Sequence, residues 1–201
     1  MPFQTAVLAS DNKGKLDEFK LLLASIEFEL RPQSHYKIDA IPETGASFLE
    51  NALLKARHAS RLTSLPTLAD DSGLVVPSLN GAPGIYSARY AGTSANSEKN
   101  NLKLLDALRN SESRRAYFFC TLVFLLHSEG PTPIVAFGEW HGNIAEEAKG
   151  NNGFGYDPLF VAKGFQITAA QMEPELKNCV SHRAIASTNL IQSIQDRREQ
   201  I

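Results

Sequence analysis

The run TAVLASDNKGKLDEFKLLL at residues 5–23 decides the fold class, because a strand leads directly into a helix. Thr5–Ala9 is typical of a buried strand. Ser10, Asp11 and Asn12 supply side chains that cap a helix start. The apolar positions after them keep a helical period: Leu16, Phe19, Leu22 and Leu23. The stretch therefore predicts one strand–helix unit.

The alternation of strands and helices continues along the chain. We predict a strand near Phe28–Arg31 and a helix that begins at Ser47, where Ser47 and Glu50 fit a capping box. Pro66 breaks that helix, and Thr67–Ala69 is predicted to form a short strand.

The second half of the chain contains the longest predicted strands. Residues 74–76 predict an extended run, and leucines at helical spacing predict a helix within residues 94–108. Residues 115–127 and 134–142 can form an antiparallel hairpin, and the tail from Ser181 is predicted to be helical. Together these elements predict an α/β protein with a mixed sheet.

Composition excludes several classes of protein. The chain has 201 residues, of which 43% are hydrophobic and 21% charged, and its formal net charge is −2. This balance fits one globular domain and gives no global attraction to nucleic acid or anionic membranes. The longest apolar run, Ala116–Leu126, is shorter than the roughly 20 residues of a membrane helix. We expect no separable linker within residues 1–201, no nucleic-acid partner and no membrane partner.

The two cysteines and the N-terminus predict a cytoplasmic location. Cys120 lies in an apolar run and Cys179 in a polar one, without the spacing of a zinc site. The first residues lack the charged and apolar regions of a signal peptide.

The segment Ser10–Lys15 has the chemistry of a phosphate-binding loop. Backbone N–H groups at a helix start, a glycine and two lysines all favour a polyanion. The spacing differs from a Walker A loop, since Leu16 stands where Ser or Thr would bind magnesium. The alternative is a capped helix start with solvated lysines.

Four carboxylates suggest a magnesium site: Glu43, Glu50, Asp70 and Asp71. Mg²⁺ takes one or two protein carboxylates and fills its other positions with water and phosphate. Adjacent residues on an extended segment face opposite ways, so only one of Asp70 and Asp71 should reach a given metal, and spacing does not say which. The alternatives are a turn at residues 70–73 and a purely capping role for Glu50.

Two later segments carry candidate nucleotide-binding residues. Residues 150–158 hold Phe154 and Tyr156 among turn formers, so the two rings either sandwich a planar base or plug the core. His182 and Arg183 fall in the first turn of the terminal helix, where cations oppose the helix dipole. An anionic or carbonyl-bearing ligand would compensate, and the alternative is a solvated surface pair.

Six ordered stretches together resemble the inosine/xanthosine triphosphate pyrophosphatase family, and in particular its bacterial dITP/XTP pyrophosphatase members. They are SDNKGK at 10–15, ETGASFLENALLKARHAS at 43–60, ADDSGL at 69–74, NGAPGIYSARYAG at 80–92, GFGYDP at 153–158 and KNCVSHRA at 177–184. Small departures occur at 151–152 and at Cys179. The matches extend over nearly the whole chain.

The resemblance implies a two-lobed α/β fold, with a long central mixed sheet flanked by helices and the active site in the cleft between the lobes. It implies a homodimer that hydrolyses non-standard purine nucleoside triphosphates to the monophosphate and pyrophosphate with Mg²⁺. It also implies residue roles. Asp71 would be the catalytic base and a metal ligand, and Glu43 the second metal ligand. Substrate would contact Ser10, Asp11, Asn12, Lys13, Gly14, Lys15, Ser72, Phe154, Gly155, Tyr156, Asp157, Lys177, His182 and Arg183.

These roles are chemically consistent with one another. Magnesium and Lys15 would neutralise the leaving pyrophosphate, while Asp71 orients or deprotonates water that attacks the α-phosphorus. Donors from His182 or Arg183 would favour a 6-carbonyl purine over adenine. The competing hypotheses are a pyrophosphatase for other bases, such as pyrimidine or thymidine triphosphates, and a nucleotide sensor without catalysis.

Overall fold

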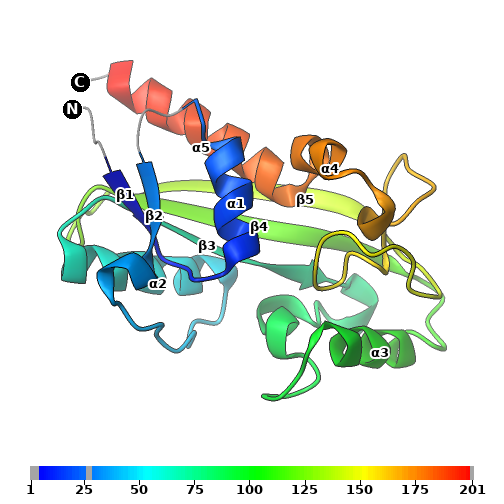
Figure 1. The fold of residues 1–201 in the computed structure, drawn as a ribbon. Helices are drawn as coiled ribbons and strands as arrows, with labels where there is room; N and C mark the ends of the chain where they lie inside the picture. Colours follow the sequence, from blue (N-terminus) through cyan, green and yellow to red (C-terminus); the bar gives the residue numbers. More distant parts are fainter. Residues whose placement is uncertain (1–4, 26–28, 200–201) are drawn as a thin grey trace. The chain divides into compact units, whose positions relative to one another are not determined.

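A computed structural model describes residues 5–25 and 29–199 of the chain. The strands are β1 (Thr5–Leu8), β2 (Glu29–Pro32), β3 (Thr67–Val75), β4 (Arg115–Leu125), β5 (Ile134–Ile144) and β6 (Phe160–Ala162). The α-helices are α1 (Lys13–Leu22), α2 (Phe48–Thr63), α3 (Ser97–Ala107), α4 (Pro174–Val180) and α5 (His182–Glu199). The strands are hydrogen-bonded in the order β2-β1-β3-β4-β5-β6 (Figure 1). β1 is parallel to β2 and β3, whereas β5 and β6 are antiparallel, which confirms the predicted mixed α/β fold.

Local side-chain contacts set the predicted helix starts. Asn12 accepts a hydrogen bond from the Lys15 N–H at 3.1 Å and caps α1. Ser47 accepts from the Glu50 N–H at 3.2 Å, and Glu50 accepts from the Ser47 N–H at 3.0 Å. This reciprocal pair is the predicted capping box, and α2 ends at Thr63, ahead of Pro66.

The chain divides into two compact units. The first unit comprises Met1–Asp71, Cys120–Gly138 and Arg183–Ile201, and the second comprises Ser72–Phe119 and Glu139–His182. The predicted two lobes, and the cleft between them, stay predictions.

In the first unit, helices pack against both faces of the strands. Leu8 of β1 joins a core cluster with residues of α1 and α5, whereas its neighbour Val7 joins a cluster with α2. This alternation is the two-residue period of a strand. Small side chains let α2 approach the sheet closely: Ala52, Ala56 and Ala59 are fully buried. Figure 1 shows α1 and α5 on one side of these strands and α2 on the other.

The core of the second unit contains a group of packed aromatic rings. Phe118 lies 4.8 Å, centroid to centroid, from the rings of both Phe160 and His182. Trp140 packs beside them and is 6% exposed. Aromatic pairs of this kind add stabilisation beyond the apolar area that they bury.

Two details differ from the sequence-based predictions. β3 continues through Asp70 and Asp71, so the turn predicted as an alternative for residues 70–73 is wrong. β6 was not predicted, and Phe28 of the predicted second strand lies outside the described residues. Within the described ranges, each helix is too short or too polar to cross a membrane.

Candidate active site

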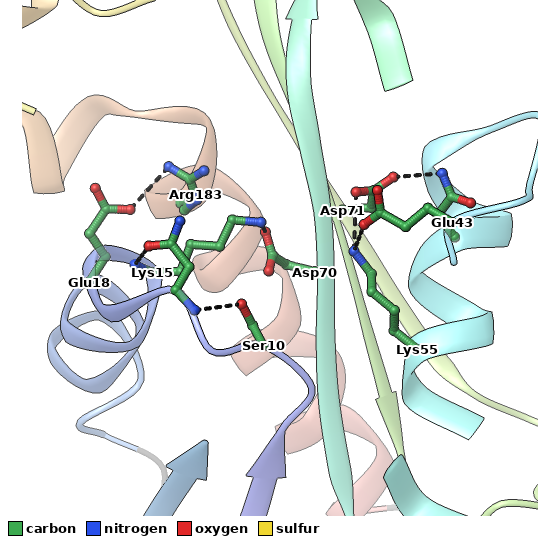
Figure 2. Close-up of polar contacts among 10 residues, drawn as sticks. Ser10, Lys15, Glu18, Glu43, Lys55, Asp70, Asp71 and Arg183 are labelled. Carbon is green, nitrogen blue, oxygen red and sulfur yellow. Dashed lines mark hydrogen bonds and ion pairs between the residues drawn. The ribbon is translucent and has the colours of Figure 1, made fainter. Parts of the chain in front are cut away.

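Strand β3 presents its two adjacent carboxylates on opposite faces. Leu68 packs into the cluster that contains α1 and α5, and Ala69 packs into the cluster that contains α2. The same alternation carries Asp70 to the first face and Asp71 to the second, as Figure 2 shows. One strand therefore supplies two separate charged clusters.

Asp70 forms a buried ion pair with the predicted phosphate loop. Lys15 Nζ lies 2.8 Å from Asp70 Oδ2, and the two side chains are 17% and 0% exposed. Burial by itself raises the pKa of Asp70, but nearby cations outweigh it and lower the pKa to about 2. In order of effect these cations are Lys15, Lys55 and Arg183. Asp70 is therefore ionised at neutral pH and fixes the start of α1 to the sheet.

Asp71 belongs to a second cluster built on α2. Lys55 Nζ lies 2.7 Å from Glu43 Oε1 and 3.2 Å from Asp71 Oδ1, while Asn51 Nδ2 donates to Asp71 Oδ2 at 3.1 Å. Burial raises the pKa of Asp71 although Lys55 opposes it, and Glu43 raises it further. Burial lowers the pKa of Lys55, but the surrounding carboxylates raise it by more. The site thus holds a carboxylate with a raised pKa beside a fixed cation, which is a typical environment for acid–base chemistry.

The pair of Glu43 and Asp71 fits the needs of magnesium. Within residues 5–25 and 29–199, no group of three or more His, Cys, Asp or Glu side chains could hold a metal by itself. Mg²⁺ needs only one or two carboxylates when substrate phosphate supplies other oxygens. Both carboxylates already surround one cation, the Lys55 ammonium. Their oxygens are therefore suited to sharing positive charge.

Side chains of the predicted phosphate loop form hydrogen bonds within the loop and to the segment after β2. Ser10 Oγ accepts from the Asn12 N–H at 3.3 Å. Asp11 accepts from Gln33 Nε2 at 2.8 Å and from the Ser34 N–H at 2.9 Å, so its carboxylate braces the segment after β2. Lys13 is exposed and Gly14 half-buried. The alternative of two solvated lysines is therefore wrong for Lys15, and the phosphate contacts of both lysines stay predictions.

The second unit contains the predicted aromatic loop. Tyr156 is 3% exposed and its hydroxyl donates to the Ser87 carbonyl at 2.9 Å, so its ring plugs the core and has no free face for a base. Phe154 is 39% exposed. Asp157 forms a buried ion pair with Lys177 at 2.6 Å and accepts from the Phe154 N–H at 2.9 Å. The predicted sandwich by two rings is thus corrected to a single accessible ring.

Glycines permit the tight path of this loop. A Cβ on Gly153, whose φ is +74°, would lie 2.1 Å from Asp157 Oδ2. Gly155 has φ +64° and its carbonyl accepts from Asn101 Nδ2 at 3.2 Å. The loop is therefore held in one conformation by side chains of its own unit.

His182 and Arg183 are both buried, so the solvated alternative is wrong for this pair. His182 is 2% exposed and its ring stacks on Phe118 at an interplanar angle of 12°. Arg183 is 5% exposed and donates to Glu18 Oε2 at 3.1 Å. Ser72 is half-buried and begins the second unit directly after Asp71. The substrate contacts of these residues stay predictions.

Sequence reasoning missed Asn51 and Lys55. They lie four residues apart, so they project from the same face of α2. The buried alanines Ala52 and Ala56 each follow one of them by one position, so the polar pair borders the apolar stripe of the helix, and Asn51 itself is fully buried. Their position beside an apolar stripe was the signal that could have identified them. Polar groups at such positions are partly or fully buried, and buried polar groups have hydrogen-bond partners.

Comparison with known proteins identifies the family. The model of the Ham1 family matches residues 6–193. The chain belongs to the Ham1 family. A relative named dITP/XTP pyrophosphatase from Xanthomonas oryzae pv. oryzae is 52% identical over 186 residues, covering 92% of this chain and 94% of that protein. A protein of the same name from Legionella pneumophila (strain Lens) is also 52% identical, with coverage of 92% and 95%.

Solved structures support the same assignment. The HAM1 protein from Coxiella burnetii has a TM-score of 0.91 and 43% identity, covering 96% of this chain and 99% of that one. The Staphylococcus aureus Ham1 protein has a TM-score of 0.84 and 40% identity, with coverage of 97% and 100%. The mixed sheet and its flanking helices are therefore the Ham1 fold.

Proposed function

We propose that the chain is a hydrolase of acid anhydrides that acts on non-standard purine nucleoside triphosphates. It would convert dITP, ITP, XTP and dXTP to the monophosphate and pyrophosphate, and so remove these nucleotides before they enter DNA or RNA. Two observations support the proposal. The chain belongs to the Ham1 family, and relatives at about 50% identity over most of its length are named dITP/XTP pyrophosphatase.

The observation that carries the chemistry is the cluster of Asp71, Glu43 and Lys55. Asp71 is 6% exposed and has a raised pKa, so its carboxylate has a greater affinity for a proton than an exposed one. Asp71 would orient the attacking water and accept its proton at a carboxylate oxygen. A protein that only bound nucleotide would gain little from two carboxylates beside a polyanion.

Glu43 and Asp71 would hold Mg²⁺, which supplies positive charge to the triphosphate oxygens when it is bound. Lys55 would retain positive charge beside Asp71, since the neighbouring carboxylates raise its pKa by more than burial lowers it. The ammonium of Lys15 lies 2.8 Å from Asp70. Lys15 would contact a phosphate only by sharing its charge between that phosphate and Asp70.

Base selection would come from the buried donors of the last motif. A 6-carbonyl accepts a hydrogen bond where the 6-amino group of adenine donates one, so a fixed donor separates the two. Arg183 is held by Glu18, and His182 is held by its aromatic stack. Fixed donors of this kind can discriminate strongly, because the wrong base leaves them unpaired.

A panel of nucleoside triphosphates with Mg²⁺ tests the proposal. Release of orthophosphate from dITP, ITP and XTP should require added inorganic pyrophosphatase, because cleavage at the α-phosphorus yields pyrophosphate. Direct release of orthophosphate would contradict that cleavage site. Equal turnover of dITP, dGTP and dTTP would contradict the base preference, and binding without turnover would favour a sensor.

We also propose that the protein is a cytoplasmic homodimer. This proposal follows from the resemblance of its motifs and from two cysteines that are both free. Light scattering during size-exclusion chromatography tests the dimer, since a monomeric mass at micromolar concentration would contradict it.

A further inference from the structure

Asn51 uses both ends of its side-chain amide inside the first unit. The residue is fully buried on α2. Its Nδ2 donates to Asp71 Oδ2 at 3.1 Å, and its Oδ1 accepts from the Gly45 N–H at 2.8 Å. The opposite orientation of the amide would set its oxygen against a carboxylate and its NH₂ against an N–H. The two partners therefore fix a single orientation.

The contact to Gly45 also fixes the loop that carries Glu43. Three successive backbone N–H groups of this loop bind side chains at the start of α2. The Gly45 N–H binds Asn51, and the N–H groups of Ala46 and Ser47 both bind Glu50. The backbone two residues after Glu43 is thus tied to the side chain that bonds Asp71.

Gly45 allows this close approach because it has no side chain. A Cβ at this position would lie 2.6 Å from the Cβ of Glu50 and 2.8 Å from Asn51 Oδ1. Neither distance is tolerated by a real Cβ, so a larger residue would displace the loop or the amide. Glycine at position 45 is therefore required for the close packing of this loop against Glu50 and Asn51.

We propose that Asn51 is a positioning residue for the hydrolysis described above. Its Nδ2 holds Asp71 Oδ2 so that Asp71 Oδ1 faces Lys55, and its Oδ1 sets the distance of Glu43 from the same cation. The inference rests on the proposed function for its reaction and on the contacts of Asn51 for its geometry. Groups that orient metal-binding carboxylates commonly change affinity or activity by about 10- to 100-fold when they are removed.

Two substitutions of Asn51 distinguish a role in positioning the carboxylates from a role in the stability of the fold alone. Asn51→Asp keeps the shape of the side chain and an oxygen for the Gly45 N–H, but it loses the donor to Asp71. Asn51→Leu loses both contacts. Asn100→Leu is the matched control, because Asn100 is a buried amide of the second unit that bonds only backbone groups in the described structure, at Ser87, Ala88 and Ala91.

The experiment measures kcat and KM for dITP, unfolding in urea, and Mn²⁺ affinity by water-proton relaxation without nucleotide. Both Asn51 variants should lose kcat by about 10- to 100-fold with little change in KM. Asn51→Leu should also weaken Mn²⁺ binding. Asn100→Leu should lower stability and leave Mn²⁺ affinity unchanged.

The possible results distinguish two failures. If the wild-type protein releases no pyrophosphate from any nucleotide, the proposed function fails, and Mn²⁺ affinity still tests the positioning. If the wild-type protein is active and Asn51→Asp retains its kcat, the donor to Asp71 has no positioning role and the inference is overturned. Unchanged Mn²⁺ affinity in Asn51→Leu overturns it as well.

Discussion

Replacing Asp70 by asparagine should lower the stability of the fold, whereas the same replacement at Asp71 should not. The fall in the pKa of Asp70 from 3.8 to about 2 corresponds to about 2 kcal/mol, since one pKa unit is worth about 1.4 kcal/mol. Removing one partner of a buried pair typically costs about 3–5 kcal/mol. Lys15 keeps 17% exposure, so its unpaired charge is partly hydrated. We therefore expect Asp70→Asn to lower the free energy of unfolding by about 2–3 kcal/mol at pH 7.

The effect of Asp70→Asn should depend on pH. Because the folded-state pKa of Asp70 lies below its unfolded value, its contribution is complete above the unfolded pKa of 3.8 and is lost as pH falls toward 2. The difference between wild type and variant should therefore shrink between about pH 4 and pH 2. Urea denaturation at pH 7, 4 and 3 measures this difference directly.

Asp71→Asn is the matched control in the same strand. Its folded-state pKa is raised, so ionised Asp71 destabilises the fold at neutral pH. The asparagine variant should be as stable as wild type at pH 7 or more stable. Equal destabilisation by both substitutions, or a cost at Asp70 that does not change with pH, would refute the assignment of opposite electrostatic roles.

Three further predictions concern catalysis, base selection and thiol reactivity. Asp71→Asn should abolish turnover while calorimetry still detects nucleotide binding, and a near-normal kcat would remove Asp71 from the chemistry. Arg183→Ala should reduce the ratio of kcat/KM for dITP over dATP, and an unchanged ratio would count against base recognition by Arg183. The native protein should react with a disulfide reagent at Cys179 only, because Cys120 is buried and burial raises its pKa. Reaction at both thiols without denaturant would contradict the buried position of Cys120.

The helix starts could be predicted from sequence because their causes are local. The cap by Asn12 and the capping box of Ser47 involve residues three positions apart. The continuity of β3 could not be predicted in this way, because Asp70 and Asp71 have turn-forming preferences. In the fold, Lys15 and Lys55 from two distant helices pair with these carboxylates. Tertiary charge pairing therefore overrides the local preference.

The candidate site shows the same limit. The motifs identified Glu43 and Asp71, and the alternation of a strand predicted that Asp70 and Asp71 face apart. Neither the motifs nor the strand period indicated that Asn51 and Lys55 complete the cluster, since their partners lie 12 to 20 residues away. Tyr156 was indicated by the sequence, but its environment was not. An aromatic residue among turn formers is equally compatible with a ligand pocket and with the core.

The position of Asp70 and Asp71 on a strand explains how this protein tolerates an unfavourable carboxylate. Ionised Asp71 destabilises the fold, because burial raises its pKa and Glu43 adds like charge. Asp70 has the opposite effect through its pair with Lys15. On a flexible loop the two carboxylates could exchange cations, whereas a strand inside a sheet holds them on opposite faces. One residue step along β3 thus separates a stabilising carboxylate from one suited to chemistry, and rigid elements on both sides maintain that separation.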